Sequence, residues 1–249
     1  MKYGISELSI VPVRNAKNSD SAMCTQLLYG EFFKVLENKK KYCRIRTFPD
    51  GCEGWVDIRQ IRQLSKKEFK YLENLKRVKL CADLVSFIEV ENQLIPIMLG
   101  SRLNGLKILA HDYNGEFVKF SVKKKALTPL ALSYLNAPYL DGGKTPFGID
   151  ASGLIQMVYR LYGKELPRTI EGQSKEGEVL SFIEESVAGD LAFFDNSEGE
   201  LIHIGIMLED HHIIHSYGKV RIDRIDHTGI FNREEKRYTH KLRMIKKIV

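Results

Sequence analysis

Two histidines lie in successive apolar runs toward the C-terminal end of the sequence. His203 falls within residues 201–208 and His215 within residues 213–216, with an acidic turn expected between the two runs. Antiparallel strands joined by this turn would each direct one imidazole toward a shared interior. One histidine on an apolar strand is usually an ordinary core residue, whereas a facing pair could serve as a general base and the partner that orients it. The other histidines have no comparable context: His211 and His212 lie at the turn, and His111, His227 and His240 lie elsewhere.

A capped helix is predicted ahead of these strands. Asp150 occupies an N-cap position before apolar residues at helical spacing, and Gly163 is a natural stop. Position 151 therefore lies in the first turn, where free backbone N–H groups and the helix dipole favour an anion. Cysteine peptidases place their thiolate in this geometry, beside a histidine that lowers the thiol pKa. The residue here is Ala151, which has nothing to ionise, and periodicity alone favours a plain core helix.

The first half of the sequence predicts small β-rich elements. Residues 1–64 contain short apolar or alternating runs separated by turn residues, a pattern typical of a small closed barrel. These runs are residues 9–13, 26–28, 32–36, 42–47 and 55–58. Residues 65–79 carry apolar side chains at helical spacing among many charges, so they are expected to form a connecting helix.

Strand character returns after this helix, in residues 80–122. The predicted strands are residues 84–90, 94–99, 106–110 and 117–122, which would make a second small barrel or extend the first. Residues 126–135 are a helix candidate that ends before a proline. Residues 123–249 then combine helices with later strands, so the expected fold class is α+β.

Composition and charge narrow the function classes. The 249 residues are 43% hydrophobic with a net charge of +6, which is enough chain for one or two domains with full cores. No apolar stretch has the length of a membrane span, and residues 3–14 do not resemble a signal-peptide core, so we expect a cytoplasmic protein, or a periplasmic or secreted one if a leader was removed. The lysine runs indicate solvated faces that could attract an anionic ligand, and their pattern does not favour nucleic acid as a partner.

The cysteines predict no metal chemistry. They show neither a C-x-x-C pair nor zinc-ligand spacing with the histidines. We therefore expect reduced structural thiols and no metal site. Separately, we expect no cofactor and a monomeric protein. The four cysteines are Cys24, Cys43, Cys52 and Cys81.

Several segments together resemble the NlpC family of papain-like cell-wall endopeptidases. The matching segments are Tyr139 with Gly142-Gly143, PFGIDASGL, LPRT with Gln173, GDLAFF, HIGIML and IIHS. Gly54-Trp55-Val56 more loosely resembles the closing strand of the bacterial SH3-like domains that often precede such catalytic domains. The resemblance implies an SH3-like domain over residues 1–64, a second one or a β extension over 80–122, and an NlpC-type domain over 123–249.

The same resemblance implies the catalytic positions. Ala151 stands at the position of the nucleophile, His203 at that of the general base and His215 at that of the base-orienting residue. Asp150 and Ser152 flank the nucleophile and would hold the substrate.

Four further residues are implied as substrate contacts. Tyr139 would support the substrate carbonyl or the oxyanion with its hydroxyl group. Thr169 stands where relatives carry an aspartate for the substrate's free amine, and Asp141 stands where a tryptophan is expected. Glu53, in the SH3-like part, is a further candidate for contact with the amine.

The implied activity is that of a cysteine-type endopeptidase of the dipeptidyl-peptidase VI type. Such enzymes cleave γ-D-Glu–diamino-acid bonds in muropeptides that carry a free N-terminal L-Ala. The family motif Asp-Cys-Ser-Gly appears here with Ala151 in place of the cysteine, so the chain as written should be inactive. A deliberate knockout and a natural loss account for Ala151 equally well, and the departures at Asp141 and Thr169 fit natural loss.

Two alternatives to a peptidase remain. The first is a natural pseudoenzyme that binds muropeptides or another protein through the retained site. The second, a lipid-directed acyltransferase or amidase, is disfavoured because those relatives typically place the histidine ahead of the cysteine, whereas both candidate histidines follow position 151 here.

Overall fold

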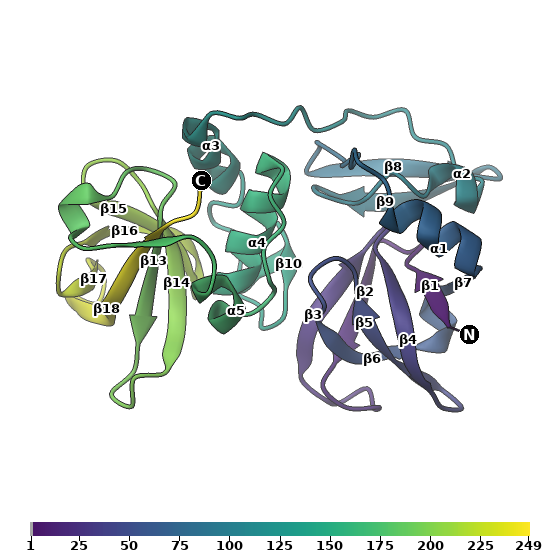
Figure 1. Ribbon diagram of the computed structural model, residues 1–249, viewed down its shortest axis with the longest axis horizontal. Helices are drawn as coiled ribbons and strands as arrows, with labels where there is room; N and C mark the ends of the chain where they lie inside the picture. The colour runs from purple at the N-terminus through teal and green to yellow at the C-terminus, as the bar shows by residue number, and fades with distance from the viewer. Residues whose placement is uncertain (1) are drawn as a thin grey trace. The chain divides into compact units, whose positions relative to one another are not determined.

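The computed structural model describes residues 2–249, which divide into two compact units (Figure 1). Unit 1 comprises the chain up to Lys119 together with Asp141–Thr145, and unit 2 comprises Phe120–Leu140 and Pro146–Val249. Each unit has its own hydrophobic core. Within residues 2–249, no helix combines the length and the apolar character needed to cross a bilayer.

Unit 1 is built on a seven-stranded sheet with the strand order β3-β2-β6-β5-β4-β1-β7. Buried and more exposed residues alternate along β2 and β5, as expected where one face of a strand lies on a core. Val11, Phe33, Ile45 and Val56 contribute to that core. The strands are β1 (Tyr3–Ile5), β2 (Ile10–Arg14), β3 (Met23–Leu28), β4 (Phe32–Asn38), β5 (Tyr42–Thr47), β6 (Glu53–Asp57) and β7 (Arg62–Leu64), with the 3-10 turn η1 (Ile58–Gln60) before β7.

A helix and a hairpin follow this sheet. Helix α1 (Lys66–Glu73) begins at a capping box, in which the Ser65 and Glu68 side chains each accept a hydrogen bond from the other residue's backbone N–H. Its buried face joins a second core cluster of unit 1. Strands β8 (Val85–Val90) and β9 (Gln93–Met98) then form a two-stranded antiparallel hairpin. All four cysteines belong to unit 1, and none of them forms a disulfide.

Two segments that the sequence predicts as strands are not strands. Residues 106–110 form the short helix α2 (Leu106–Leu109), which Ala110 ends in the left-handed region with φ 58°. Leu106 and Leu109 lie on the same side of that turn and both contact the core, which a strand would not allow. Residues 117–122 contribute a single isolated bridge, between Phe117 and Cys81.

The helices of unit 2 precede most of its strands. The turn η2 (Lys124–Ala126) leads into α3 (Leu127–Leu132), where a helix is predicted for residues 126–135. Helix α4 (Ala151–Tyr162) packs against α3, β14 and β15, and all but its last residue are buried. The remaining short elements of unit 2 are β11 (Gly148–Ile149), α5 (Ile170–Ser174), β12 (Glu178–Leu180) and η3 (Ile183–Glu185), whereas β10 (Lys144–Thr145) belongs to unit 1.

The main sheet of unit 2 has the strand order β12-β18-β13-β14-β15-β16-β17. An additional pairing between β17 and β18 joins its far end back to β18, so these strands close on themselves. The strands are β13 (Leu191–Asp195), β14 (Leu201–Met207), β15 (His212–Tyr217), β16 (Lys219–Ile225), β17 (Gly229–Asn232) and β18 (Arg237–Lys247). A helix packed on an antiparallel sheet confirms the expected α+β class.

Candidate active site

The N-terminus of α4 has the predicted geometry. Asp150 is the N-cap, and its Oδ1 accepts a hydrogen bond of 2.6 Å from the backbone N–H of Gly153. Ala151 is the first helical residue and is buried, with 6% of its surface exposed. The helix ends at Gly163, whose φ of 106° no other residue adopts without strain. Position 151 therefore lies at the positive end of a buried helix, where a thiolate would be stabilised.

Arg168, which the sequence does not single out, completes this N-terminus. Its guanidinium donates to both carboxylate oxygens of Asp150, at 3.0 and 2.5 Å, and to Ser152 Oγ at 2.7 Å. The side chain of Arg168 is only 4% exposed. A carboxylate beside position 151 would by itself oppose a thiolate, so the neighbouring guanidinium offsets a charge that would otherwise work against the helix dipole.

The other polar residues of this region have structural roles. Thr169 is the N-cap of α5, since its Oγ1 accepts from the Gly172 N–H at 3.1 Å. Gln173 is fully buried, and its Nε2 donates to the carbonyls of Ser152 and Pro167. These contacts hold the segment after α4 against the beginning of that helix.

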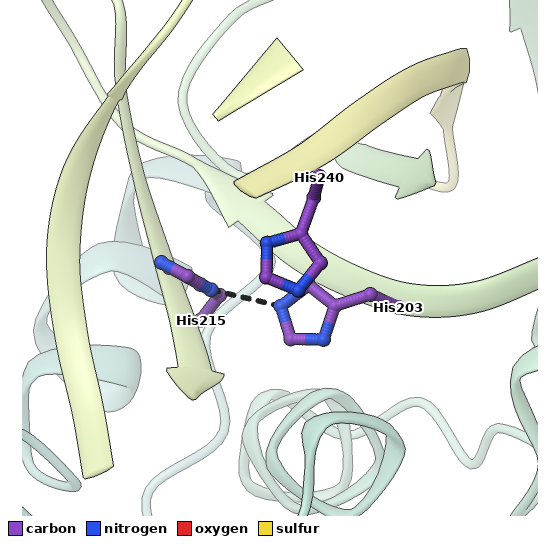
Figure 2. A group of neighbouring side chains, drawn as sticks. All are labelled: His203, His215 and His240. Atoms are coloured by element: carbon purple, nitrogen blue, oxygen red, sulfur yellow. Dashed lines mark hydrogen bonds between the residues drawn. The ribbon is translucent and has the colours of Figure 1, made fainter. Parts of the chain in front are cut away.

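His203 and His215 face one another across neighbouring strands, as the sequence predicts (Figure 2). His203 lies on β14 and His215 on β15, and His203 Nε2 is 2.8 Å from His215 Nδ1. On its other side, His215 Nε2 is 3.0 Å from Oδ2 of Asp223, a residue of β16. Ile213 pairs with Asp223 across β15 and β16, so His215, two residues further on, reaches Asp223 diagonally on the same face.

This chain of hydrogen bonds fixes where the protons lie. The Asp223 carboxylate also accepts from Arg221, at 2.7 Å to Oδ2. Burial acts to raise the pKa of Asp223, but the hydrogen bonds from His215 and Arg221 outweigh it and lower that pKa below 3.8. An ionised Asp223 only accepts, so His215 Nε2–H donates to it and His215 Nδ1 accepts from His203 Nε2–H. The unprotonated nitrogen of His203 is then Nδ1, which is the form a general base requires.

Burial also keeps both imidazoles neutral. His215 has no exposed surface and His203 is 5% exposed. Burial lowers the pKa of His203 well below 6.5, and the neighbouring His215 and His240 lower it further. The pKa of His215 is lowered by burial too, although Asp223 counteracts the shift.

A third imidazole, that of His240, lies against this pair, although nothing around it in the sequence indicates such a place. His240 comes from β18, and its ring stacks on that of His203 with centroids 4.1 Å apart and planes at 25° (Figure 2). Its Nδ1 lies 2.9 Å from Thr239 Oγ1. Burial is the main reason why the pKa of His240 falls from 6.5 to about 4.

A hydrogen bond connects the histidine strands to the helix start. Ser216, which follows His215 on β15, donates from its Oγ to the carbonyl of Ile149 at 2.8 Å. Ile149 immediately precedes the N-cap Asp150, and α4 packs on both β14 and β15. The candidate nucleophile position and the candidate base therefore belong to adjoining elements of one unit.

The remaining predicted contacts are less closely tied to this arrangement. Tyr139 is in unit 2, is 42% exposed, and forms a parallel bridge with Ile149. Asp141 and Glu53 belong to unit 1. The Glu53 carboxylate on β6 accepts from Arg44 at 2.7 Å and from Arg46 at 2.8 Å, so its charge is already shared by two guanidinium groups.

Comparison with protein families finds two matches. A model described as the NlpC/P60 family matches residues 136–240, and one described as the bacterial dipeptidyl-peptidase Sh3 domain matches residues 13–61. These matches cover both the candidate site and the strands of unit 1 that surround Trp55.

Curated proteins give relatives of the same type. A gamma-D-glutamyl-L-lysine dipeptidyl-peptidase of Bacillus subtilis is 26% identical over 229 residues, covering 80% of this chain and 73% of the relative. Another of that name from Bacillus cereus is 34% identical over 224 residues, covering 77% and 66%. A bifunctional muramidase/DL-endopeptidase of Bacillus subtilis is 43% identical over 79 residues, which are 30% of this chain and 24% of that protein.

Solved structures agree on the fold. The crystal structure of an NlpC/P60 family protein from Bacillus cereus superposes with a TM-score of 0.79 at 18% identity, covering 99% of both chains. The sequence-based resemblance is thereby confirmed in both of its parts. The chain belongs to the NlpC/P60 family, with a bacterial SH3 domain ahead of its NlpC/P60 domain.

Proposed function

We propose that unit 2 is the scaffold of a cysteine-type endopeptidase for cell-wall peptides, and that the chain as written binds such peptides without cleaving them. The substrate class would be a muropeptide with a free N-terminal L-Ala, recognised at its γ-D-Glu–diamino-acid bond. The observation that carries the proposal is the hydrogen-bonded series His203–His215–Asp223, attached to a helix whose capped N-terminus begins at Ala151. The names of the two dipeptidyl-peptidase relatives support the substrate class.

The proposed chemistry gives each of these residues a step. With a thiol at position 151, the helix N-terminus would favour the thiolate and His203 Nδ1 would take its proton. The thiolate would attack the peptide carbonyl, and the His203 imidazolium would return the proton to the leaving amine. Water would then release the acyl group, while Asp223 and His215 hold the tautomer of His203 throughout.

Ala151 removes the first of these steps and leaves the others in place. Loss of a triad nucleophile lowers the rate of a hydrolase by about 10⁶. Binding does not require the thiol, because the N-cap, the Arg168 network and the histidines do not depend on it.

Restoring the nucleophile tests the proposal. Ala151→Cys should release L-Ala-γ-D-Glu from L-Ala-γ-D-Glu-diaminopimelate, detected by mass spectrometry in the presence of reductant and a chelator. Ala151→Cys combined with His203→Ala should lose this activity, and Ala151→Ser, which lacks a thiol of low pKa, should show far less. No release above the Ala151 background, from a folded and reduced cysteine variant, would refute the endopeptidase proposal.

A pseudoenzyme that binds muropeptides or another protein is the second candidate. It is favoured by Ala151 itself and by Thr169, whose side-chain oxygen already caps α5 rather than offering a charge to an amine. Calorimetry of tripeptide binding, combined with the cysteine-rescue assay, separates the two candidates. Even a millimolar dissociation constant, which corresponds to a binding free energy of about −4 kcal/mol, is measurable in this way. Heat of binding for the tripeptide without rescue by Ala151→Cys would favour a muropeptide-binding pseudoenzyme, whereas neither heat nor rescue would favour a protein partner.

A further inference from the structure

His203, His215 and His240 form a compact group of ring nitrogens, here called the histidine cluster (Figure 2). One nitrogen from each ring lies within 4.8 Å of the other two. The peptidase mechanism uses His203 and His215 but gives no task to His240, which comes from a different strand. We propose that the histidine cluster binds one divalent transition-metal ion of the Zn²⁺ class.

The spacing of the nitrogens suits such an ion. Zn²⁺ binds imidazole nitrogens at about 2.0–2.1 Å, so two ligands of a tetrahedral site lie about 3.3 Å apart. The pair His203 Nε2 and His215 Nδ1 is now at 2.8 Å, and all three nitrogens lie within 4.8 Å. A shift of the rings by about 1 Å therefore brings the three into a tetrahedral arrangement with one open position.

The partners of the outer nitrogens support a ligand role. Metal-bound histidines usually bond their second ring nitrogen to a carboxylate, carbonyl or hydroxyl group, which fixes the ring and the tautomer. His215 Nε2 forms such a hydrogen bond with the Asp223 carboxylate at 3.0 Å, and His240 Nδ1 lies 2.9 Å from the hydroxyl oxygen of Thr239. His203 Nε2 and His215 Nδ1 face one another, and His240 has its Nε2 left to offer. Metal binding would require the His203 proton to move from Nε2 to Nδ1, which leaves Nε2 free to coordinate.

The charge around the cluster is also suitable. Its three rings are neutral ligands, and the nearest carboxylate, Asp223, supplies negative charge in the outer shell. Arg221 pairs with the same carboxylate, through Nε to the Oδ2 that His215 also bonds and through Nη2 to Oδ1, and offsets part of its charge. His240 is only partly buried and is the most exposed member of the cluster.

Cobalt provides the direct test. The chain as written, stripped with a chelator and titrated with Co²⁺, should bind one equivalent and show the visible ligand-field bands of a low-coordinate nitrogen site. Zn²⁺ should displace the cobalt. The four cysteines of unit 1 are the competing explanation, and cobalt binding to them would show thiolate-to-cobalt charge transfer instead.

Three variants assign the ligands. His240→Phe keeps the ring stacked on His203 but removes the nitrogen, so Co²⁺ affinity should fall by more than the ~10–100-fold that loss of an outer-shell partner costs. Asp223→Asn should cost ~10–100-fold. His227→Ala, an exposed histidine outside the cluster, should leave the affinity unchanged.

Either of two results would overturn the proposal. One is no Co²⁺ binding by the folded chain, and the other is equal affinity in the chain as written and in a folded His240→Phe variant. The experiment needs neither peptide nor thiol at position 151. The cleavage assay described above contains a chelator, so failure of one proposal does not entail failure of the other.

Discussion

Replacing Arg168 with methionine should destabilise unit 2 and leave unit 1 unchanged. Methionine keeps most of the buried stem, so the variant chiefly removes the guanidinium, which donates three hydrogen bonds to Asp150 and Ser152. Breaking a buried ion pair typically costs 3–5 kcal/mol, roughly. The Asp150 side chain is 15% exposed and still accepts a hydrogen bond from the Gly153 N–H. We therefore expect a smaller loss in the free energy of unfolding, about 2–4 kcal/mol.

The chain offers a built-in reporter for this experiment. Trp55, the single tryptophan, lies on β6 in unit 1, so its fluorescence during urea unfolding follows unit 1 alone. Far-UV circular dichroism follows both units. Arg168→Met should shift the circular-dichroism transition of unit 2 to lower urea and leave the Trp55 transition in place.

Two controls make the result specific. Arg237→Met breaks a pair with Glu235 whose arginine is 63% exposed, so it should cost less than about 1 kcal/mol. Adding Asp150→Asn to Arg168→Met removes the stranded charge and keeps a good N-cap, so the double variant should be more stable than the sum of the single changes implies. A loss below about 1 kcal/mol for Arg168→Met, with additive free energies, would refute the assigned role of the pair.

Two further predictions concern the helix end and the histidines. Gly163→Ala should lower the free energy of unfolding by about 1–3 kcal/mol in the same assay, because alanine is strained at φ 106°. Gly163→Asn should cost less. A Gly163→Ala variant as stable as the chain with Gly163 would contradict the assignment of Gly163 as the helix cap. In chelator, unit 2 should lose stability as the pH falls from 7.5 to 5, because His203, His215 and His240 take up protons when unfolded near pH 6.5 but resist them when folded. His240, with its pKa lowered to about 4, accounts for at most about 2 kcal/mol of this loss, and His240→Phe should remove that part. A free energy of unfolding that does not change between pH 7.5 and 5 would contradict the buried neutral state of the histidines.

The predictions that the structure confirms rest on patterns among residues that are close together in the sequence. The start of α4 follows from an N-cap and a 3.6-residue period, both of which are properties of adjacent residues. The facing of His203 and His215 follows from alternation along two strands joined by a short turn. The run at residues 106–110 was predicted wrongly because five residues, four of them apolar, are too few to distinguish a helical period from a strand.

Two of the residues that the sequence missed, Asp223 and His240, are placed by long-range strand pairing. Asp223 reaches His215 through the register of β15 with β16, and His240 reaches His203 because β18 pairs with both β13 and β17. Neither register is encoded by a neighbouring motif. The expectation of no metal site rested on ligand spacing along the chain, and the histidine cluster draws its members from three separate strands, β14, β15 and β18.

Some residues of the site are explained by stability alone, whereas others indicate a function. Asp150, Arg168 and Thr169 stabilise helix ends, so any chain with this fold would benefit from them whether or not it cleaves peptides. The buried series His203–His215–Asp223 is different, because apolar residues of similar volume would fill the same barrel without the cost of burying polar groups. Its presence in the same unit as an alanine at position 151 is therefore the feature that a stability argument leaves unexplained. Binding of a peptide or of a metal ion would supply the missing reason, and the cysteine-rescue, calorimetric and cobalt experiments separate these explanations.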